Sequence, residues 1–139
     1  MIVIDCSVLV FFFTDVGTAG EQARERVARE DIIAAPGLID YEIVSAMVGL
    51  ARGRRGGAPK ITRTQLQRAF EGFRAMPIDR YPTLDLWQRV RDLSTNLSAY
   101  DAQYVALAEA LGTPLITSDA RIEKSGVARC PIEVLPTGS

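Results

Sequence analysis

The chain has 139 residues, with 16 basic and 17 acidic side chains, a formal net charge of −1 and no histidine. Its length suits a single domain, and its apolar and charged fractions of 47% and 24% are those of an ordinary globular protein. The missing histidine excludes Ser-His-Asp and Cys-His catalysis, paired-histidine phosphodiester cleavage and every metal site that needs imidazole. Any acid–base or metal chemistry must therefore depend mainly on carboxylates.

The two cysteines, Cys6 and Cys130, are too few and too far apart for a disulfide framework or a Cys-x-x-Cys metal site, which favours a reducing, cytoplasmic setting. The apolar residues 8–13 lack the flanks of a targeting signal, and no stretch approaches the ~20 apolar residues of a membrane span. We therefore expect no membrane association, and one domain over residues 1–136 followed by a tail at 137–139.

Short β-branched runs alternate with helical patterns along the first half of the chain. Residue pairs with capping-box spacing, Thr18 with Glu21 and Thr62 with Gln65, mark two helix starts. Apolar spacing and Gly/Pro breaks place the other boundaries. Strands are expected at 2–4, 32–35, 76–80, 114–117 and 132–135, and helices at 8–13, 18–29, 38–52, 62–73, 84–93 and 98–112. Such alternation predicts an α/β fold with a mostly parallel sheet covered on both faces.

Charge is distributed unevenly along the chain. Residues 1–49 carry a net charge of −5, residues 50–74 carry +6 and residues 75–139 carry −2. The positive segment joins a glycine-rich loop at 52–59 to the following helix, and all but one of its cations are arginines, which suit phosphate. It predicts either a nucleic-acid contact or a solvated face of an arginine-rich chain.

Four acids fall where one edge of a parallel sheet is expected. Asp5 closes the first strand, Asp119 follows the strand at 114–117, and Glu42 and Asp101 occupy helix starts. Together they would repel one another unless a cation neutralised them, and clustered carboxylates favour Mg²⁺ or Mn²⁺.

Each acid also has an ordinary structural explanation. Asp101 can complete a capping box with Ser98, Glu42 can complement a helix dipole, and Asp119 can be a turn residue. Asp5 is the hardest to explain in this way, because an acid after a buried strand is costly unless something binds it.

The ordered set of motifs is specific. Asp5-x-Ser7, a glutamate at the start of the third helix, Leu97-Ser-Ala-Tyr-Asp-Ala102 and Leu115-Ile-Thr-Ser-Asp119 together resemble a PIN domain, and more narrowly a VapC-type ribonuclease toxin of a bacterial toxin–antitoxin pair. The likeness extends over essentially the whole chain. It implies a three-layer α/β/α sandwich and a metal-dependent endoribonuclease.

The resemblance also implies roles for individual residues. Asp5, Glu42, Asp101 and Asp119 become an acidic quartet, in which Asp5 and Asp101 are metal ligands and Glu42 and Asp119 bind directly or through water. The family's hydroxyl positions are matched by Ser7 and Thr117, which would orient the carboxylates. The positive segment, rather than the resemblance, leads us to expect that five residues contact RNA: Arg52, Arg54, Arg55, Lys60 and Arg63.

We expect phosphodiester hydrolysis with one or two Mg²⁺ or Mn²⁺ ions and water as nucleophile. The resemblance further implies a cognate VapB-type antitoxin and a homodimer. The main alternative is a catalytically silent PIN-like module that binds RNA or protein. A phospho-receiver domain fits less well, because Asp5 is followed by Cys6 and Ser7 rather than by a paired acid.

Overall fold

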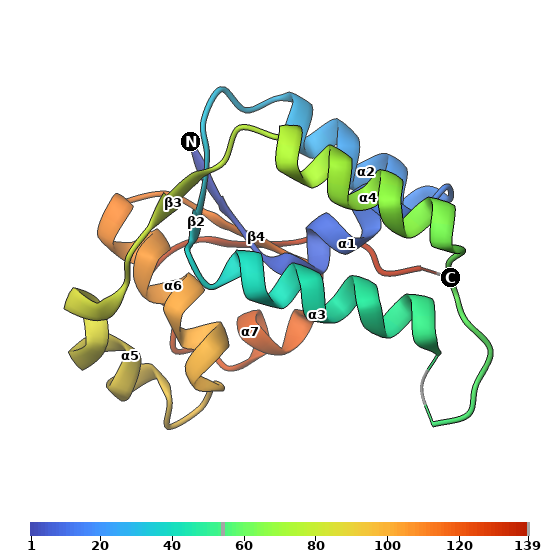
Figure 1. Ribbon diagram of the computed structural model, residues 1–139. Coiled ribbons are helices and arrows are strands. Elements are labelled where there is room, and N and C mark those ends of the chain that lie inside the picture. The colour runs from blue at the N-terminus through green and yellow to red at the C-terminus, as the bar shows by residue number, and fades with distance from the viewer. Residues whose placement is uncertain (54, 139) are drawn as a thin grey trace.

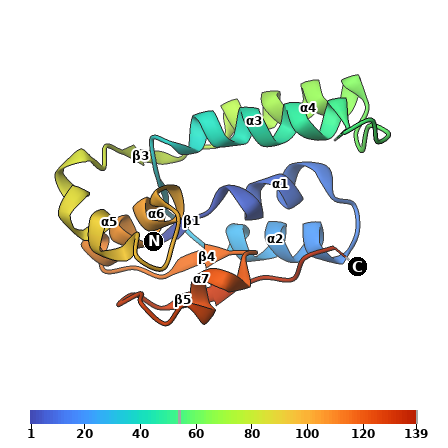
Figure 2. The same cartoon turned by 90° about the horizontal axis from the view of Figure 1, so that it is seen from below.

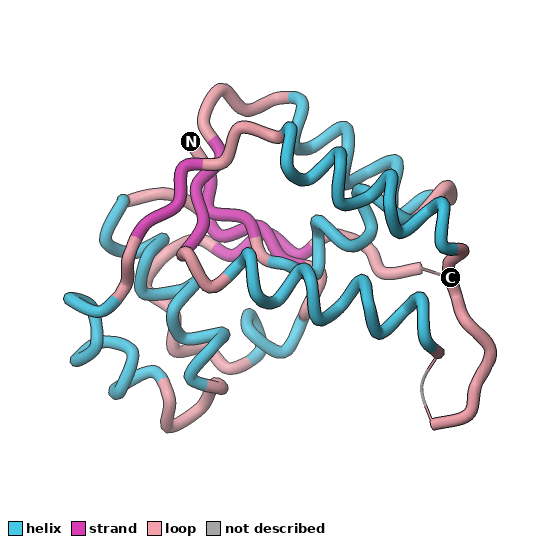
Figure 3. The backbone as a smooth tube through the Cα atoms, viewed as in Figure 1, coloured by secondary structure: helices cyan, strands magenta, loops and turns pink. Residues whose placement is uncertain are grey.

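The structure is a computed structural model that describes residues 1–53 and 55–138, so Arg54 and Ser139 lie outside the described residues. Within these ranges five strands form one parallel sheet in the order β3-β2-β1-β4-β5. The strands lie next to one another with helices around them (Figure 3). They are β1 (Ile2–Ile4), β2 (Ile33–Pro36), β3 (Asp79–Tyr81), β4 (Leu115–Thr117) and β5 (Ile132–Val134).

The helices cover both faces of the sheet. They are α1 (Cys6–Thr14), α2 (Thr18–Ala28), α3 (Ile39–Arg52), α4 (Arg63–Ala75), α5 (Trp87–Leu93), α6 (Ala99–Leu111) and α7 (Ala120–Lys124). Across the sheet, the chain moves from β1 through β2 to β3 in one direction. It then returns to β4, on the other side of β1, and continues outward to β5. Right-handed crossovers therefore place α1–α4 on one face and α5–α7 on the opposite face. Figures 1 and 2 show α3 beside α4, with α5 and α6 grouped away from them. The predicted three-layer α/β/α sandwich is confirmed.

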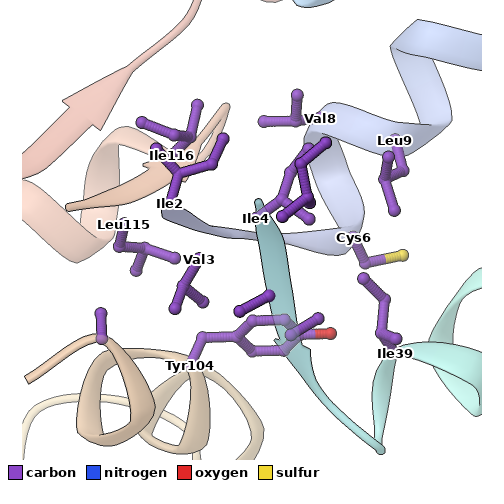
Figure 4. Packing of buried hydrophobic residues seen from close by; sticks show 14 of the residues in the cluster. Ile2, Val3, Ile4, Cys6, Val8, Leu9, Ile39, Tyr104, Leu115 and Ile116 are labelled. Atoms are coloured by element: carbon purple, nitrogen blue, oxygen red, sulfur yellow. The ribbon is translucent and has the colours of Figure 1, made fainter. Parts of the chain in front are cut away.

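The core lies on both sides of β1. Ile2, Val3 and Ile4 are fully buried, because helices cover both faces of this central strand. In Figure 4, Tyr104 of α6 packs below the strand, and Leu9 of α1 lies on the far side from it. Although β1 has only three residues, packing on both of its faces therefore holds it in place, together with Asp5, which directly follows it.

The two predicted capping boxes have different outcomes. Thr62 forms its box, since its Oγ1 accepts from the Gln65 N–H (3.1 Å) and its own N–H donates to Gln65 Oε1 (2.7 Å). The Thr18 box is wrong, because Thr18 is already helical and makes no side-chain cap. Asp15 supplies the acceptor instead, with its Oδ2 2.8 Å from the Gly20 nitrogen.

Other boundaries differ from the predictions. Helix α1 begins at Cys6, directly after Asp5, and β3 begins at Asp79, later than expected. The predicted helix over 84–93 is split into a 3₁₀ turn, η1 (Leu84–Leu86), and α5. Helix α7 was not predicted. Within the described ranges, no helix has the length and apolar character needed to cross a membrane.

Candidate active site

The site lies where the strand order reverses. Strand β1 pairs with β2 on one side and β4 on the other, so chain connections leave its two flanks in opposite directions. In open α/β sheets, ligands bind in the crevice outside the carboxyl ends of strands at such a switch point. Four acids line one pocket of about 700 Å³ here: Asp5, Glu42, Asp101 and Asp119.

Asp5 is the most deeply placed of these acids, with 6% of its surface exposed. Two hydroxyls donate to its Oδ2, Thr117 Oγ1 at 2.7 Å and Ser7 Oγ at 2.9 Å. Burial raises the pKa of Asp5, while these hydrogen bonds lower it and the nearby charge of Asp101 raises it further. Hydrogen bonds to one oxygen therefore hold the Asp5 side chain in place, while burial destabilises its charged form.

The same hydroxyls connect Asp5 to the loop after β4. Ser7 Oγ accepts from the Ser118 N–H at 3.0 Å, and Thr117 Oγ1 accepts from the Asp119 N–H at 2.9 Å. These bonds tie the end of β1 to the end of β4, which are adjacent strands. The positions of Asp5 and Asp119 are thus coupled through two side chains that the sequence analysis singled out.

Glu42 is half-buried in the first turn of α3. Burial raises its pKa, the Tyr104 hydroxyl lowers it, and the charges of Asp5 and Asp101 raise it further. Although Tyr104 lies close enough to have this effect, the contact does not reach hydrogen-bond geometry. Glu42 Oε1 and the Tyr104 hydroxyl are both buried without a hydrogen-bond partner in the part of the chain that the structure describes. A buried carboxylate oxygen without a donor is costly, which indicates a position for a cation or a proton.

Asp101 lies in the first turn of helix α6. Its backbone N–H donates to Ser98 Oγ at 3.0 Å, so Ser98 is the N-cap. Burial raises the pKa of the Asp101 carboxyl, the Ser98 hydroxyl lowers it, and the charge of Asp119 raises it while that of Arg121 lowers it. The cap therefore uses the backbone of Asp101 and leaves its side chain facing the pocket.

Asp119 is the exception among the four acids. Arg121 binds both of its carboxylate oxygens, with Nε 2.9 Å from Oδ1 and Nη2 2.7 Å from Oδ2. The Arg121 side chain lowers the pKa of Asp119, whereas the pKa values of the other three acids are raised. Asp119 also caps α7 by accepting the Arg121 N–H at 3.0 Å. At Asp119, an arginine of the same chain therefore supplies the positive charge that neutralises the carboxylate.

The remaining three carboxylates fit a hard cation by chemistry. Among the described residues, Asp5, Glu42 and Asp101 form no ion pair, and Glu42 supplies an oxygen that lacks a donor. Burial and the nearby acids Asp5 and Glu42 raise the pKa of the Cys6 thiol, so oxygen donors predominate. However, no three Asp, Glu or Cys side chains within 1–53 and 55–138 already form a ligand cluster. The donors are suitable, but a bound ion would have to bring them closer together.

The predicted RNA-contacting residues lie elsewhere. Those that the structure describes, Arg52, Arg55, Lys60 and Arg63, are exposed and do not line the acid pocket. Arg52 follows Glu42 by ten positions along α3, or about 15 Å at 1.5 Å per residue. Arg54 lies outside the described residues, so the structure says nothing of its part in this set. In Figure 1 the segment between α3 and α4 follows the C-terminal end of α3, whereas Glu42 lies in the first turn of that helix.

Two residues of the site were not assigned a role from the sequence. Tyr104 follows Asp101 by three positions, a spacing that places both on one helix face and could have indicated it. Arg121 follows Asp119 by two positions. The two side chains meet because Asp119 is the N-cap of the short helix α7, which contains Arg121.

Comparison with known proteins identifies the family to which this fold belongs. A PIN-domain family model matches residues 2–127. Ribonuclease VapC9 of Mycobacterium tuberculosis (strain ATCC 25618 / H37Rv) is 41% identical over 136 residues, which cover 98% of this chain and 99% of the relative. The solved structure of VapC20 of Mycobacterium tuberculosis, described as a sarcin-ricin loop cleaving toxin, has a TM-score of 0.69 at 14% identity and covers 98% of this chain and all of that one.

A toxin–antitoxin structure is also similar. VapBC2 of Rickettsia felis, solved bound to a DNA fragment from its promoter, has a TM-score of 0.64 at 15% identity and covers 97% of this chain and 99% of that one. With its parallel sandwich and acid-lined switch point, the chain belongs to the PIN-domain family and, within that family, to the VapC ribonucleases. The resemblance inferred from the sequence motifs is confirmed.

Proposed function

We propose that this chain is a divalent-metal-dependent endoribonuclease, the toxin component of a type II toxin–antitoxin module, and that it hydrolyses RNA phosphodiester bonds in the acid pocket. The observation that carries the proposal is the convergence of Asp5, Glu42 and Asp101 on one pocket, where none of the three forms an ion pair within the described residues. The relative VapC9 is named a ribonuclease, which supports the same activity for this chain.

Mg²⁺ or Mn²⁺ is the cofactor in this proposal, held by Asp5 and Asp101, with Glu42 and Asp119 binding directly or through water. Such an ion supplies Lewis acidity, which acidifies water and offsets the charge that develops on phosphate. The chain's own residues organise the site. Ser7 and Thr117 fix Asp5 through one oxygen, Oδ2, and leave Oδ1 for the pocket.

Glu42 is the residue best suited to accept a proton from an attacking water. The chain has no histidine, so a carboxylate must do this work. Its buried Oε1 has no hydrogen-bond donor among the described residues, so this oxygen is available to accept a proton. The Tyr104 hydroxyl lies beside this carboxylate and would help to orient it.

The proposed partners are an RNA substrate, a VapB-type antitoxin and a second copy of the chain in a homodimer, all in the cytoplasm. The antitoxin is supported by the similarity to the VapBC2 complex. A carboxylate-lined pocket is a suitable docking point for a partner's arginine, and the Arg121 contact with Asp119 shows that a guanidinium fits at its rim.

The test is cleavage of purified total RNA with Mg²⁺ or Mn²⁺, compared with excess EDTA. We expect cleavage by the intact chain that EDTA abolishes. The Asp5→Asn variant should lose cleavage, while the matched control Asp31→Asn, at an exposed position outside the pocket, should retain it. Full activity of Asp5→Asn, or undiminished activity in EDTA, would refute the mechanism.

A further inference from the structure

Two exposed tyrosines flank the acid pocket. Tyr41 of α3 is 77% exposed and Tyr100 of α6 is 59% exposed, and both line the same pocket as the four acids. Of the large apolar side chains that are exposed in the described residues, these two alone line this pocket. Aromatic rings left in water at a functional pocket indicate a surface that a ligand covers.

The two tyrosines occupy equivalent places in their helices. Each lies in the first turn and directly precedes an acid of the site, as Tyr41-Glu42 and Tyr100-Asp101. Successive helical residues point about 100° apart, so a helix that turns the acid inward places the preceding tyrosine at the rim. Because α3 and α6 supply different parts of the lining, the rings border the carboxylates from two helices.

We propose that Tyr41 and Tyr100 are base-stacking residues that seat unpaired nucleotides at the acid pocket. This inference rests on the proposed ribonuclease function and adds the two residues that hold the bases next to the cleaved bond. Every base offers a π face to a tyrosine ring, whereas bases within a duplex are already stacked on their neighbours. Stacking also provides attraction that does not depend on phosphate charge, which the neighbouring carboxylates repel.

RNA fits this rim better than an apolar protein segment does. A protein partner that covers an apolar surface would be expected to meet exposed aliphatic side chains, but the larger aliphatic residues of this lining, Val10 and Leu38, are only partly exposed, and its two exposed large side chains are aromatic. The same rim carries Arg121, whose side chain is 85% exposed and can meet a phosphate. Aromatic rings with an adjacent arginine are the combination that binds single strands.

The test measures RNA affinity in the Asp5→Asn chain, which should bind without cutting. The probes are a fluorescein-labelled unstructured oligoribonucleotide and the same strand annealed to its complement, both in Mg²⁺. We expect Tyr41→Ala and Tyr100→Ala each to weaken single-strand binding roughly tenfold, with little effect on the duplex. Tyr41→Phe and Tyr100→Phe should retain binding, because the ring remains.

Trp87→Ala is the matched control, since Trp87 is 53% exposed but lines a different hollow, beside Thr83 and Leu84. In the cleaving chain, the alanine variants should raise KM more than they lower kcat.

Unchanged single-strand affinity, equal losses for alanine and phenylalanine, or no RNA binding at all by the Asp5→Asn chain would overturn the stacking role. Weaker binding of a VapB-type antitoxin with unchanged RNA affinity would assign the rim to protein instead. If the intact chain cuts no RNA, the ribonuclease proposal fails separately, because the binding experiment does not depend on cleavage.

Discussion

Thr117 Oγ1 donates a 2.7 Å hydrogen bond to Oδ2 of Asp5, joining residues that are 112 positions apart in the sequence. The bond crosses from the end of β4 to the end of the neighbouring strand β1. Thr117 also accepts the Asp119 N–H, so one hydroxyl contacts two of the four acids. The geometry at the sheet switch point therefore depends on this side chain.

Thr117→Val should disturb both stability and activity. Valine keeps the shape of threonine but leaves Asp5 Oδ2 with Ser7 as its one side-chain donor among the described residues, and removes the acceptor of the Asp119 N–H. We expect the free energy of unfolding at neutral pH to fall by about 1–3 kcal/mol, as measured by urea denaturation. RNA cleavage should fall as well. Thr117→Ser, which keeps the hydroxyl, should retain most of both, and equal behaviour of the valine and serine variants would contradict this account.

The metal-free protein should become less stable as the pH rises towards neutrality. Since the pKa values of Asp5, Glu42 and Asp101 are raised, the folded chain binds more protons than the unfolded chain above the ordinary carboxyl pKa. Their contribution to stability is therefore present at low pH and is lost as the pH rises through the folded values.

Asp5→Asn isolates this effect. In EDTA at neutral pH the variant should melt at a higher temperature than the wild type, and its melting temperature should fall less as the pH rises. Acids whose pKa is lowered by arginines, such as Glu30 and Glu109, act in the opposite direction but equally in both chains. A wild type that is at least as stable as the variant in EDTA at neutral pH would show that Asp5 is not destabilised as a charged group.

Arg121→Ala should release Asp119 for metal binding. The arginine occupies both oxygens of Asp119 from an exposed position, so its removal should leave the melting temperature nearly unchanged. We expect tighter Mn²⁺ binding by calorimetry. Arg29→Ala, at an exposed position after α2, is the control. Weaker Mn²⁺ binding by Arg121→Ala would mean that the arginine supports the ligands rather than competing for one.

Charge reversal in the loop between α3 and α4 should weaken RNA binding and make it less dependent on salt. Arg55 and Lys60 are exposed there, so Arg55→Glu with Lys60→Glu tests the predicted contact. Each lost phosphate contact should reduce the slope of log affinity against log salt by about 0.7 for a single strand. Unchanged affinity and slope would leave the loop as an ordinary solvated surface.

The parts of the fold that could be predicted are those with strong local signals. The buried β-branched run before Asp5 and the apolar period of α3 are visible in the sequence, and the alternation of such runs with helical patterns implies a parallel sheet. Helix α7 is too short for a periodic pattern and depends on the Asp119 cap and on the burial of Ile122. Its existence is a consequence of tertiary structure.

The site shows the same division. The convergence of the four acids could be predicted, because carboxyl ends of parallel strands meet at one edge; their catalytic roles stay predictions. The Arg121 contact with Asp119 could not be predicted, since it depends on the short helix α7, and the place of Tyr104 beside Glu42 depends on how α6 packs against α3, although its spacing from Asp101 puts both on one helix face. The sequence predicted general repulsion among the acids, whereas the structure shows one of them neutralised within the chain.

The most direct test of the central claim, that the acid pocket cuts RNA, is to map RNA 5′ ends in cells that express the intact chain or its Asp5→Asn variant. Cells with the intact chain should contain discrete new 5′ ends, and cells with the variant should contain none of these ends. The same ends in both, or no new ends with the intact chain, would contradict it, and the second result would favour a catalytically silent PIN-like module.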